Sequence, residues 1–230
     1  MKIEIWSDVI CPFCYIGKKN FEKALEEFPF KDKIEIEWKS FQLDPSLETG
    51  VVTTTSEYFR DKKGFPEAQA KQMTAQVTEM GKSVGINFNF ENAIITNTFP
   101  AHKLIHLAKK HQLGAEMEEE LFKAHFLDGK NIGDDKALIS LGEKLGLKSE
   151  NITEALSSRE IDLEVKHEII EASQLGISGV PFFVIDQKYG VSGAQPVETF
   201  REAITQAYNE NTVTARNSND ASCGEDGCNI

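Results

Sequence analysis

Two cysteines separated by two residues, in the segment Cys11-Pro12-Phe13-Cys14, are the residues of this sequence best placed to carry out chemistry. Two thiols at this spacing can close a small disulfide ring. At the start of a helix, the first sulfur faces unpaired backbone N–H groups and the positive end of the helix dipole, which favour the thiolate. The second cysteine lies one turn further on, where it can attack a mixed disulfide formed at the first. The segment therefore predicts thiol–disulfide exchange.

A second pair, Cys223 and Cys228, lies near the end of the chain behind a polar stretch at residues 209–222. It is either a second, exposed redox pair that exchanges with the first or a tail pair without a catalytic part. A flexible linker of this length reaches ~20 Å, about the radius of a small domain. Two further interpretations of the first pair stay open: half of a zinc site completed by the tail cysteines, and an inert buried thiol pair.

Hydrophobic spacing indicates the elements that position the first pair. Residues 3–10 predict a buried strand, residues 15–28 have helical spacing, and residues 34–38 alternate with charged residues as a half-buried strand does. The chain therefore opens strand–helix–strand, and the cysteine pair falls at the first strand-to-helix junction.

The middle of the chain differs from both ends. Residues 56–156 carry mostly helical apolar stripes, with a short stretch at 86–90 that could be extended. We interpret them as a helical unit inserted into an α/β domain. Beyond them, residues 180–185 predict a buried strand, residues 189–192 its hairpin partner, and the apolar residues from Val197 to Tyr208 a closing helix. The predicted division is 1–55 and 157–208 for the α/β domain, 56–156 for the insertion, and 209–230 for a flexible tail.

Pro181 begins the predicted buried strand at 180–185. Proline lacks a backbone donor and belongs at the first residue or the edge of a strand. A cis Val180-Pro181 bond would expose the Val180 backbone groups to a substrate chain, whereas the base rates of X–Pro bonds by themselves favour trans.

The composition is that of an ordinary globular protein: 230 residues, 40% hydrophobic and 27% charged. There are 25 Lys and Arg against 37 Asp and Glu, a net charge of −12. This acidity argues against a nucleic-acid or anionic-membrane partner. No segment approaches the ~18 apolar residues of a membrane span, and the first residues lack a secretory pattern. We expect a cytoplasmic protein.

The chain resembles the thioredoxin superfamily, specifically its DsbA-like branch and the cytosolic FrnE-type proteins. The resemblance extends over essentially the whole chain and rests on these segments: Cys11-Pro12-Phe13-Cys14, Phe41-Gln42-Leu43-Asp44-Pro45, Asn97-Thr98 with Ala101-His102-Lys103, Gly176-Ile177-Ser178-Gly179-Val180-Pro181-Phe182-Phe183-Val184, Val191-Ser192-Gly193-Ala194-Gln195 and the Cys223/Cys228 pair. It implies an α/β thioredoxin fold with a large inserted all-helical domain.

The resemblance also implies roles for individual residues. Cys11 is expected to be the accessible nucleophile, Cys14 the more buried resolving thiol and Pro181 a cis-proline beside Cys11. Substrate binding is expected from Val180, Pro12, Phe13 and His102, although His102 could equally pack or cap a helix start. Two departures from the family pattern argue against a strongly oxidising cysteine pair. Ile5 stands where thioredoxin has a buried acid, with Asp8 a weak substitute, and no His lies between the cysteines.

The predicted function is that of a cytosolic protein dithiol–disulfide oxidoreductase or isomerase. Its expected partners are cysteine-containing proteins and a thioredoxin or glutathione system. We expect neither a metal nor a bound cofactor, with glutathione as a possible co-substrate. The alternative is a glutathione-using enzyme of the kappa-class transferase or 2-hydroxychromene-2-carboxylate isomerase type, which usually has Ser in place of Cys11. A third interpretation is a non-catalytic peptide-binding or zinc-holding module. The acids Glu116, Glu118, Glu119 and Glu120 predict a solvated helix face.

Overall fold

The computed structural model describes the backbone of residues 1–219 and the side chains of residues 1–211. Within this part, a four-stranded sheet has the order β2-β1-β5-β6. Its strands are β1 (Lys2–Ser7), β2 (Glu35–Ser40), β5 (Phe182–Ile185) and β6 (Tyr189–Ser192). Strand β1 pairs in parallel with β2 and antiparallel with β5, which in turn pairs antiparallel with β6. The predicted strand–helix–strand opening and the distant hairpin therefore meet in one sheet.

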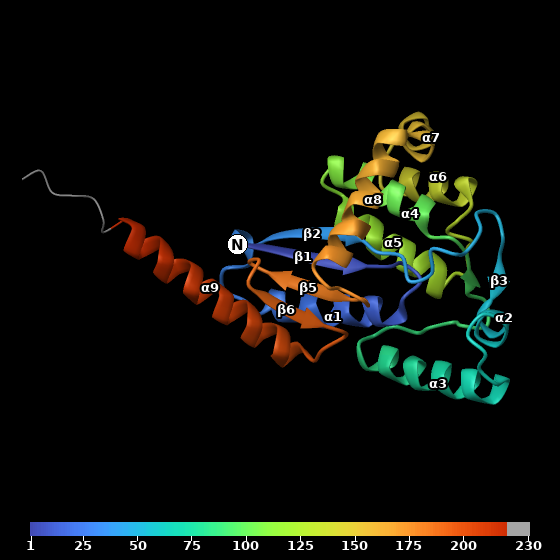
Figure 1. Ribbon diagram of the computed structural model, residues 1–230, viewed down its shortest axis with the longest axis horizontal. Coiled ribbons are helices and arrows are strands. Elements are labelled where there is room, and N and C mark those ends of the chain that lie inside the picture. Colours follow the sequence, from blue (N-terminus) through green and yellow to red (C-terminus); the bar gives the residue numbers. More distant parts are fainter. Residues whose placement is uncertain (220–230) are drawn as a thin grey trace, which may run out of the picture.

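Helices cover both faces of this sheet (Figure 1). Helix α1 (Pro12–Glu26) connects β1 to β2 and packs beside α9 (Val197–Asn219) on one face, over a core that includes Ile5, Phe183 and Phe200. On the other face, Trp6 of β1 packs against Ala172 and Ile177, at the end of α8 (Arg159–Gln174). Side chains of β1 point alternately to the two faces, because successive residues of a strand do so.

The insertion lies between β2 and β5 and is mainly helical, as expected. Its helices are α2 (Thr55–Asp61), α3 (Glu67–Ser83), α4 (Phe99–Lys110), α5 (Gly114–Phe126), α6 (Asp135–Lys144) and α7 (Ser149–Ser157), preceded by the short helix η1 (Lys31–Lys33) before β2. Helices α4 to α7 bury their apolar stripes in a second core together with the first half of α8. Helix α8 thus belongs to the helical core at one end and to the sheet at the other.

The expected extended stretch at residues 86–90 does not form a strand. Ile86 and Phe88 are instead buried in a loop that packs on α1 and α5. The small second sheet pairs β3 (Thr53–Thr54) with β4 (Ile94–Ile95). The alternation of apolar residues reflects burial of the loop and not ladder pairing, because aromatic contacts such as Phe88 with Phe126, 5.0 Å between ring centroids, fill the space.

The boundary predicted at residue 208 is wrong. Helix α9 continues to Asn219, so residues 209–219 are helical and not a flexible linker. The sequence there has few apolar residues, and the helix extends past the end of the sheet it packs on (Figure 1). Cys223 and Cys228 lie outside the described residues. No helix in the described part of the chain has the length and apolar character needed to cross a membrane.

Candidate active site

The cysteine pair lies at the junction of β1 and α1, as the spacing predicted. Cys11 is the N-cap of α1, with extended backbone angles, and Pro12 occupies the first turn, where its missing N–H removes no helical hydrogen bond. The Cys11 N–H donates to the carbonyl of Asp8 at 2.9 Å, and the Cys14 N–H donates to the carbonyl of Cys11 at 3.1 Å. These bonds hold both thiols at the positive end of the helix dipole.

The Val180–Pro181 peptide bond is cis and lies beside Cys11, which confirms the predicted arrangement. The Cys11 Sγ is 3.6 Å from the Val180 carbonyl oxygen, within the range of a thiol hydrogen bond. The Pro181 carbonyl accepts from the Gly193 N–H at 2.8 Å, so the segment at residues 191–195 fixes the proline from behind. Two regions far apart in sequence therefore form one site.

Gly17, which was not among the predicted site residues, allows this close approach. A Cβ at this position would lie 2.9 Å from Pro181 Cγ and 3.4 Å from Ala194 Cα. Helix α1 can pass this close to the proline only because residue 17 has no side chain. A glycine in the second turn of a predicted helix, six residues after Cys11, was the available signal, because glycine costs about 1 kcal/mol in a helix interior.

Both thiols are free and both are buried: Cys11 is 3% and Cys14 1% exposed. The expectation of an accessible Cys11 is therefore wrong, although Cys14 is the more buried of the two. The insertion encloses the pair with the aromatic rings of Phe88, Phe122 and Phe126, which pack together with Tyr15 of α1. Burial raises the pKa of the Cys14 thiol well above its ordinary value, and the neighbouring Cys11 adds to this.

A pocket of about 440 Å³ opens over the cysteines, between the sheet domain and helices α2, α3 and α5. Cys11 lies in its wall, together with three of the residues predicted to bind substrate, namely Pro12, Phe13 and Val180. The opposite wall is apolar and comes from the insertion, with Met73, Val77, Phe90 and Phe126 among its residues. Phe13, 40% exposed, is a large apolar side chain at its mouth. Such a concave apolar wall next to a reactive group is typical of a binding site.

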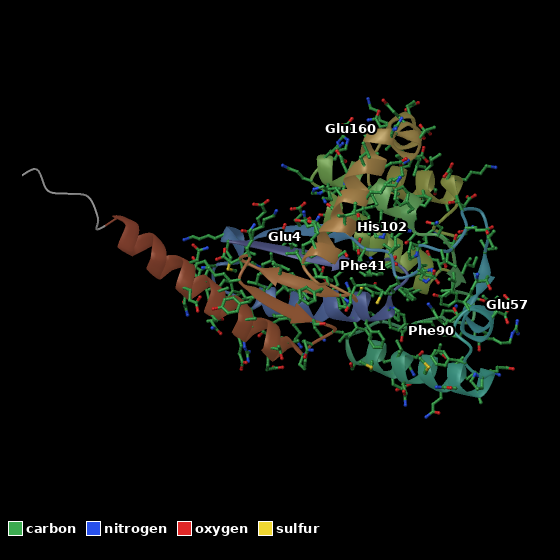
Figure 2. All side chains as sticks on the ribbon, viewed as in Figure 1. Glu4, Phe41, Glu57, Phe90, His102 and Glu160 are labelled. Atoms are coloured by element: carbon green, nitrogen blue, oxygen red, sulfur yellow. The ribbon has the colours of Figure 1, made fainter. Side chains whose placement is uncertain are left out.

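His102 does not reach this pocket, so its predicted contact with substrate is wrong. Its side chain is 1% exposed and lies inside the molecule, where the insertion meets the sheet (Figure 2). Its Nε2 is 3.6 Å from Asp8 Oδ1. Burial lowers the pKa of His102, but the nearby carboxylate of Asp8 outweighs burial and raises the pKa overall. The residue packs beneath the site.

Two of the segments that carry the family resemblance, residues 41–45 and 97–103, meet around Asp8. Its carboxylate accepts the Leu43 N–H at 2.8 Å and faces His102. The side chain of Gln42 donates to Asn97 Oδ1 at 3.2 Å. The segments at 41–45 and 97–103 therefore fix the loop that carries the cysteines.

The expectation of a solvated face on α5 is wrong for Glu118. Glu116 is exposed, but Glu118 is only 1% exposed and accepts a hydrogen bond of 2.6 Å from the Ser7 hydroxyl. The hydrogen bond from Ser7 acts to lower the pKa of Glu118, but burial outweighs it and raises the pKa overall. Helical spacing could have revealed this, because Glu118 lies one turn before Leu121 and Phe122, on the apolar face of α5.

Glu119 forms part of a partly buried ion-pair cluster instead. It binds Lys18 and Lys19 of α1, each at 2.9 Å. Burial raises the pKa of Glu119, but the two lysines outweigh it and lower the pKa to about 2. This cluster joins α5 to α1 one turn beyond Cys14, because Lys18 follows Cys14 by four residues on the same helix.

His125, also on α5, lines the floor of the pocket and is fully buried. Neither of its ring nitrogens has a hydrogen-bond partner among the described residues. Burial lowers its pKa to about 4, so the ring is neutral at neutral pH. A neutral imidazole offers one donor and one acceptor to a polar group that enters the pocket.

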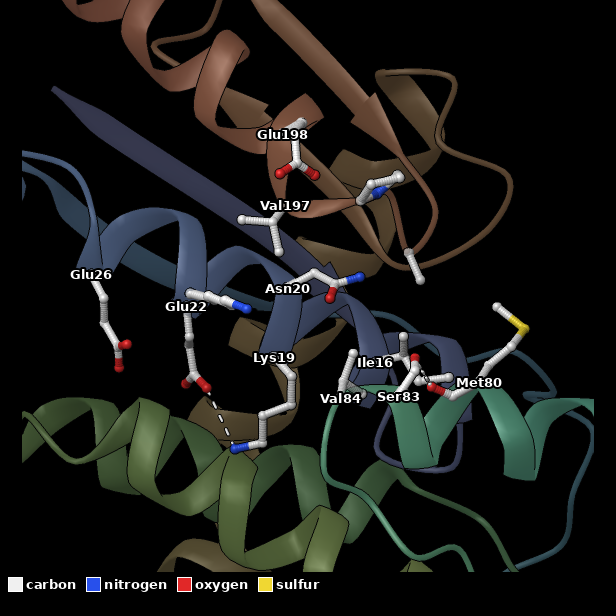
Figure 3. A pocket seen from close by; sticks show the side chains of 13 residues that line it. Ile16, Lys19, Asn20, Glu22, Glu26, Met80, Ser83, Val84, Val197 and Glu198 are labelled. Atoms are coloured by element: carbon white, nitrogen blue, oxygen red, sulfur yellow. Dashed lines mark hydrogen bonds and ion pairs between the residues drawn. The ribbon is translucent and has the colours of Figure 1, made fainter.

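A larger hollow of about 740 Å³ lies further along α1, from Ile16 to Glu26, and contains none of the predicted site residues (Figure 3). Charged side chains of both signs line it, including Lys19, Glu22 and Glu198. Lys19 and Glu22 are paired with each other at 3.4 Å. Its rim includes Ala194, which lies against Gly17, so this hollow adjoins the cis-proline from behind.

Zinc binding by Cys11 and Cys14 would need further ligands. Among residues 1–219, no group of three or more His, Cys, Asp or Glu side chains is arranged to hold a metal ion. The two tail cysteines are outside this range. The arrangement around the first pair is instead that of two thiols within one helical turn, a cis-proline and an apolar pocket.

Residues 2–205 match the family of DSBA-like thioredoxin domains. The chain belongs to this family. It is 32% identical over 208 residues to the protein YwbO of Bacillus subtilis, covering 88% of this chain and 95% of that protein. It is also similar to a solved structure, a probable DsbA oxidoreductase from Streptomyces coelicolor, with 35% identity, a TM-score of 0.87 and coverage of 100% and 99% of the two chains.

The chain also has the same fold as DsbM from Pseudomonas aeruginosa, a cytosolic disulfide reductase solved with GSH. The two chains are 17% identical, with a TM-score of 0.61 and coverage of 91% of this chain and 100% of that one. The chain thus has a DsbA-like thioredoxin fold with a helical insertion, as the sequence predicted. In this DSBA-like domain the cysteines lie at the first strand-to-helix junction, and the insertion forms one wall of the pocket above them.

Proposed function

We propose that this DSBA-like protein is a cytosolic dithiol–disulfide oxidoreductase that reduces or isomerises disulfides of protein substrates. The observation that carries the proposal is the position of Cys11. Its sulfur is at a helix N-terminus, 3.6 Å from the carbonyl next to the cis-proline, and in the wall of an apolar pocket. The proposed cytoplasmic location is supported by the similarity in fold to DsbM of Pseudomonas aeruginosa, a cytosolic disulfide reductase.

The proposed reaction has two exchange steps. The Cys11 thiolate attacks a substrate disulfide, an S–S bond to Cys11 forms, the substrate S–S bond breaks, and the released substrate thiolate takes up a proton. Cys14 then loses its proton and attacks the Cys11 sulfur. The Cys11–Cys14 disulfide forms, and the second substrate thiol leaves. Two electrons from a thioredoxin or glutathione system restore the dithiol.

Reduction and isomerisation fit the site better than strong oxidation does. A strongly oxidising pair such as that of DsbA needs a thiol pKa near ~3.5. Here no cationic side chain lies between the cysteines, and burial raises the pKa of Cys14. The helix N-terminus, which contributes at most about 2 kcal/mol, is the activating group at Cys11.

The proposed substrate contact is an extended polypeptide with an apolar residue next to its cysteine. The backbone of Val180 would pair with the peptide, and Pro12 and Phe13 would contact it beside the reactive sulfur. The apolar residue would enter the pocket against Met73 and Phe126, where His125 offers its unpartnered nitrogens to a polar group. Expulsion of water from this pocket is the main favourable contribution to binding.

Insulin reduction with dithiothreitol tests the proposal. The wild-type protein should accelerate the precipitation of insulin B chain, whereas Cys11→Ser should reduce the rate to that of dithiothreitol alone. Cys14→Ser should accumulate mixed disulfides with insulin, visible by mass spectrometry, because the resolving thiol is missing. The matched control is Cys223→Ser with Cys228→Ser. Equal rates for wild-type and Cys11→Ser proteins would disprove the proposal.

A glutathione-using enzyme is the second candidate. This chain also shares its fold with a solved 2-hydroxychromene-2-carboxylate isomerase. The larger hollow beside α1 contains two lysines, Lys19 and Lys23, that could bind the carboxylates of glutathione (Figure 3). The second thiol at residue 14 favours redox exchange over conjugation or isomerisation. Turnover of an electrophile with glutathione by Cys14→Ser, without insulin reduction by the wild type, would favour this candidate.

A further inference from the structure

The pocket beside Cys11 is lined by a buried histidine whose ring nitrogens are both unpaired within the described part of the chain. His125 of α5 is 0% exposed, and neither nitrogen has a hydrogen-bond partner there. Buried polar groups are nearly always hydrogen-bonded, so an unpaired one needs an explanation. Because His125 and the reactive cysteine line the same pocket, its missing partner can be a group of the substrate.

The hydroxyl groups in the pocket wall are already engaged. They donate to other groups of the protein: Thr55 to the Ala93 carbonyl at 3.4 Å, Thr74 to the Ala70 carbonyl at 3.1 Å and Tyr58 to the Asp44 carboxylate at 2.8 Å. Lys63 and Gln76, which also line the pocket, are exposed to solvent. A polar group that enters the pocket and leaves solvent would therefore find its partner in His125.

The wall around His125 is otherwise apolar and largely aromatic. The His125 ring packs on Phe126, with 4.4 Å between the ring centroids and 73° between the ring planes. Phe126 in turn contacts Phe90, at 5.9 Å between centroids, and Met73 lines the same pocket. Such a wall favours an aromatic side chain over a charged one, because an ion would lose its hydration there.

A phenol matches both the apolar wall and the unpaired imidazole. Burial lowers the pKa of His125 to about 4, so the ring is neutral at neutral pH and has one N–H donor and one acceptor nitrogen. A phenol hydroxyl can donate to the acceptor nitrogen or accept from the N–H. A phenylalanine ring would fill the pocket equally well but would leave the histidine unpaired.

We propose that this pocket binds a tyrosine side chain next to the reactive cysteine of a protein substrate, with His125 as the specificity-determining residue that hydrogen-bonds the tyrosine hydroxyl. This inference rests on the proposed exchange function and names its class of substrate. The pocket volume of about 440 Å³ is at the lower end of the range of ~300–1,000 Å³ for ligand pockets. It takes one large side chain, and Cys11 in its wall requires that this side chain lie directly before or after the substrate cysteine.

The hydrogen bond forms as substrate enters. Both nitrogens of His125 are shielded from solvent, so the ring rotates toward the entering hydroxyl, as interface side chains commonly do on binding. The imidazole has already lost its hydration on folding, so binding desolvates only the phenol. One uncharged hydrogen bond of this kind corresponds to a preference of roughly threefold to tenfold for tyrosine over phenylalanine.

Oxidation of the reduced protein by short peptide disulfides measures this preference. Four symmetric peptide disulfides are compared, with Tyr or Phe directly before or directly after the cysteine. The protein is the full chain with Cys223→Ser and Cys228→Ser, alone or with His125→Leu, His125→Gln or the exposed control His167→Leu. Acid quenching and chromatography give the second-order rate constant for each peptide, which reports binding in the transition state. Each is divided by the rate constant of the same peptide with dithiothreitol.

The chain with only the tail replacements should react roughly threefold to tenfold faster with a tyrosine peptide than with the matching phenylalanine peptide. His125→Leu should remove this preference, because the buried hydroxyl then has no partner. His125→Gln, whose amide supplies a donor and an acceptor, should retain more of it than His125→Leu, and His167→Leu should retain all of it. Equal rates for tyrosine and phenylalanine in both positions, or an undiminished preference in His125→Leu, would overturn the inference.

Nitrogen NMR keeps the inference testable if His125→Leu does not fold, as judged by circular dichroism. The mixed disulfides of Cys14→Ser, in the same tail background, with the tyrosine and phenylalanine peptides are compared after labelling of the five histidine rings. One histidine should show different ring nitrogen shifts in the two complexes, and identical histidine signals would overturn the inference. Equal oxidation by all four peptides would leave the exchange function intact, whereas a chain that none of them oxidises would overturn both proposals.

Discussion

The sulfur of Cys11 lies 3.6 Å from the carbonyl oxygen of Val180, a residue 169 positions later in the chain. The contact places the reactive thiol beside a backbone group that a bound peptide would also use. It also orders the two thiols, because Cys11 borders the pocket whereas Cys14, 1% exposed, does not line it.

Alkylation should therefore modify Cys11 before Cys14. With Cys223 and Cys228 replaced by Ser, iodoacetamide near neutral pH should label Cys11 first, and peptide mass spectrometry reads out the order. The reaction should be slower than that of a free cysteine peptide, because Cys11 is only 3% exposed. Initial labelling of Cys14 would contradict the assigned order.

Gly17→Ala should impair exchange. The added Cβ would meet Pro181 Cγ at 2.9 Å and force the proline away from Cys11. Overpacking costs about 1–3 kcal/mol, which exceeds the ~1 kcal/mol that Ala gains over Gly in a helix. Insulin reduction should fall by roughly tenfold or more, since small misplacements of reacting groups have large effects. Gly179→Ala is the control, because a Cβ there meets nothing within 4 Å; equal losses in both variants would refute the argument.

His125 should make the protein less stable in mild acid. Burial lowers the folded-state pKa of His125 to about 4, below the ~6.5 of an unfolded histidine. Between these values the unfolded chain binds a proton that the folded chain does not, so stability falls as pH drops through this window, by about 3 kcal/mol in all. Urea unfolding should show this loss, and His125→Leu should remove it. The exposed His167→Leu should keep it, and persistence of the loss in His125→Leu would exclude His125 as its source.

Glu168 should stabilise the packing of α8 on the sheet at neutral pH. It accepts from Lys109 at 2.6 Å, the Ser40 N–H at 2.7 Å and His106 at 2.9 Å. Burial raises the pKa of Glu168, but His106 and Lys109 outweigh burial and lower it overall. Its stabilisation is therefore complete above the unfolded pKa of ~4.3 and is lost as pH falls below that value.

Glu168→Gln should accordingly lower the free energy of unfolding by about 3 kcal/mol at neutral pH, the cost of breaking a buried ion pair. The difference from wild type should narrow in acid, measured by urea titration at both pH values. Glu160→Gln, on the exposed side of α8, should have little effect at either (Figure 2). A constant difference would show that packing, and not charge, is responsible.

If Cys223 and Cys228 form a redox relay, they should exchange electrons with the Cys11–Cys14 pair of another molecule. Helix α9 spans 23 residues, about 35 Å at 1.5 Å per residue, and leads away from the cysteines (Figure 1). The four residues from Asn219 to Cys223 reach at most about 14 Å. Replacing Cys223 and Cys228 by Ser should slow recharging of Cys11–Cys14 by some reductants, with a rate that depends on protein concentration. Unchanged recharging by every reductant would refute the relay.

Local patterns were sufficient for much of this protein. The spacing of Cys11 and Cys14 at a strand-to-helix junction, the apolar stripes of α4 to α6 and the strand at 182–185 could all be predicted, because each depends on residues within a few turns or a few strand positions. The family resemblance supplied the cis-proline, because an X–Pro bond gives no local sign of its isomer.

Only the tertiary structure decided which polar residues of the helices became buried. The charged run around Glu118 resembles a solvated face until α5 packs on α1, and His102 lies in a helix start that could face either way until Asp8 pairs with it. The pocket beside Cys11 likewise arises between two domains. Local sequence determines which side chain a helix presents on each face, but burial and pKa depend on what packs against that face, and those groups lie up to 169 residues away.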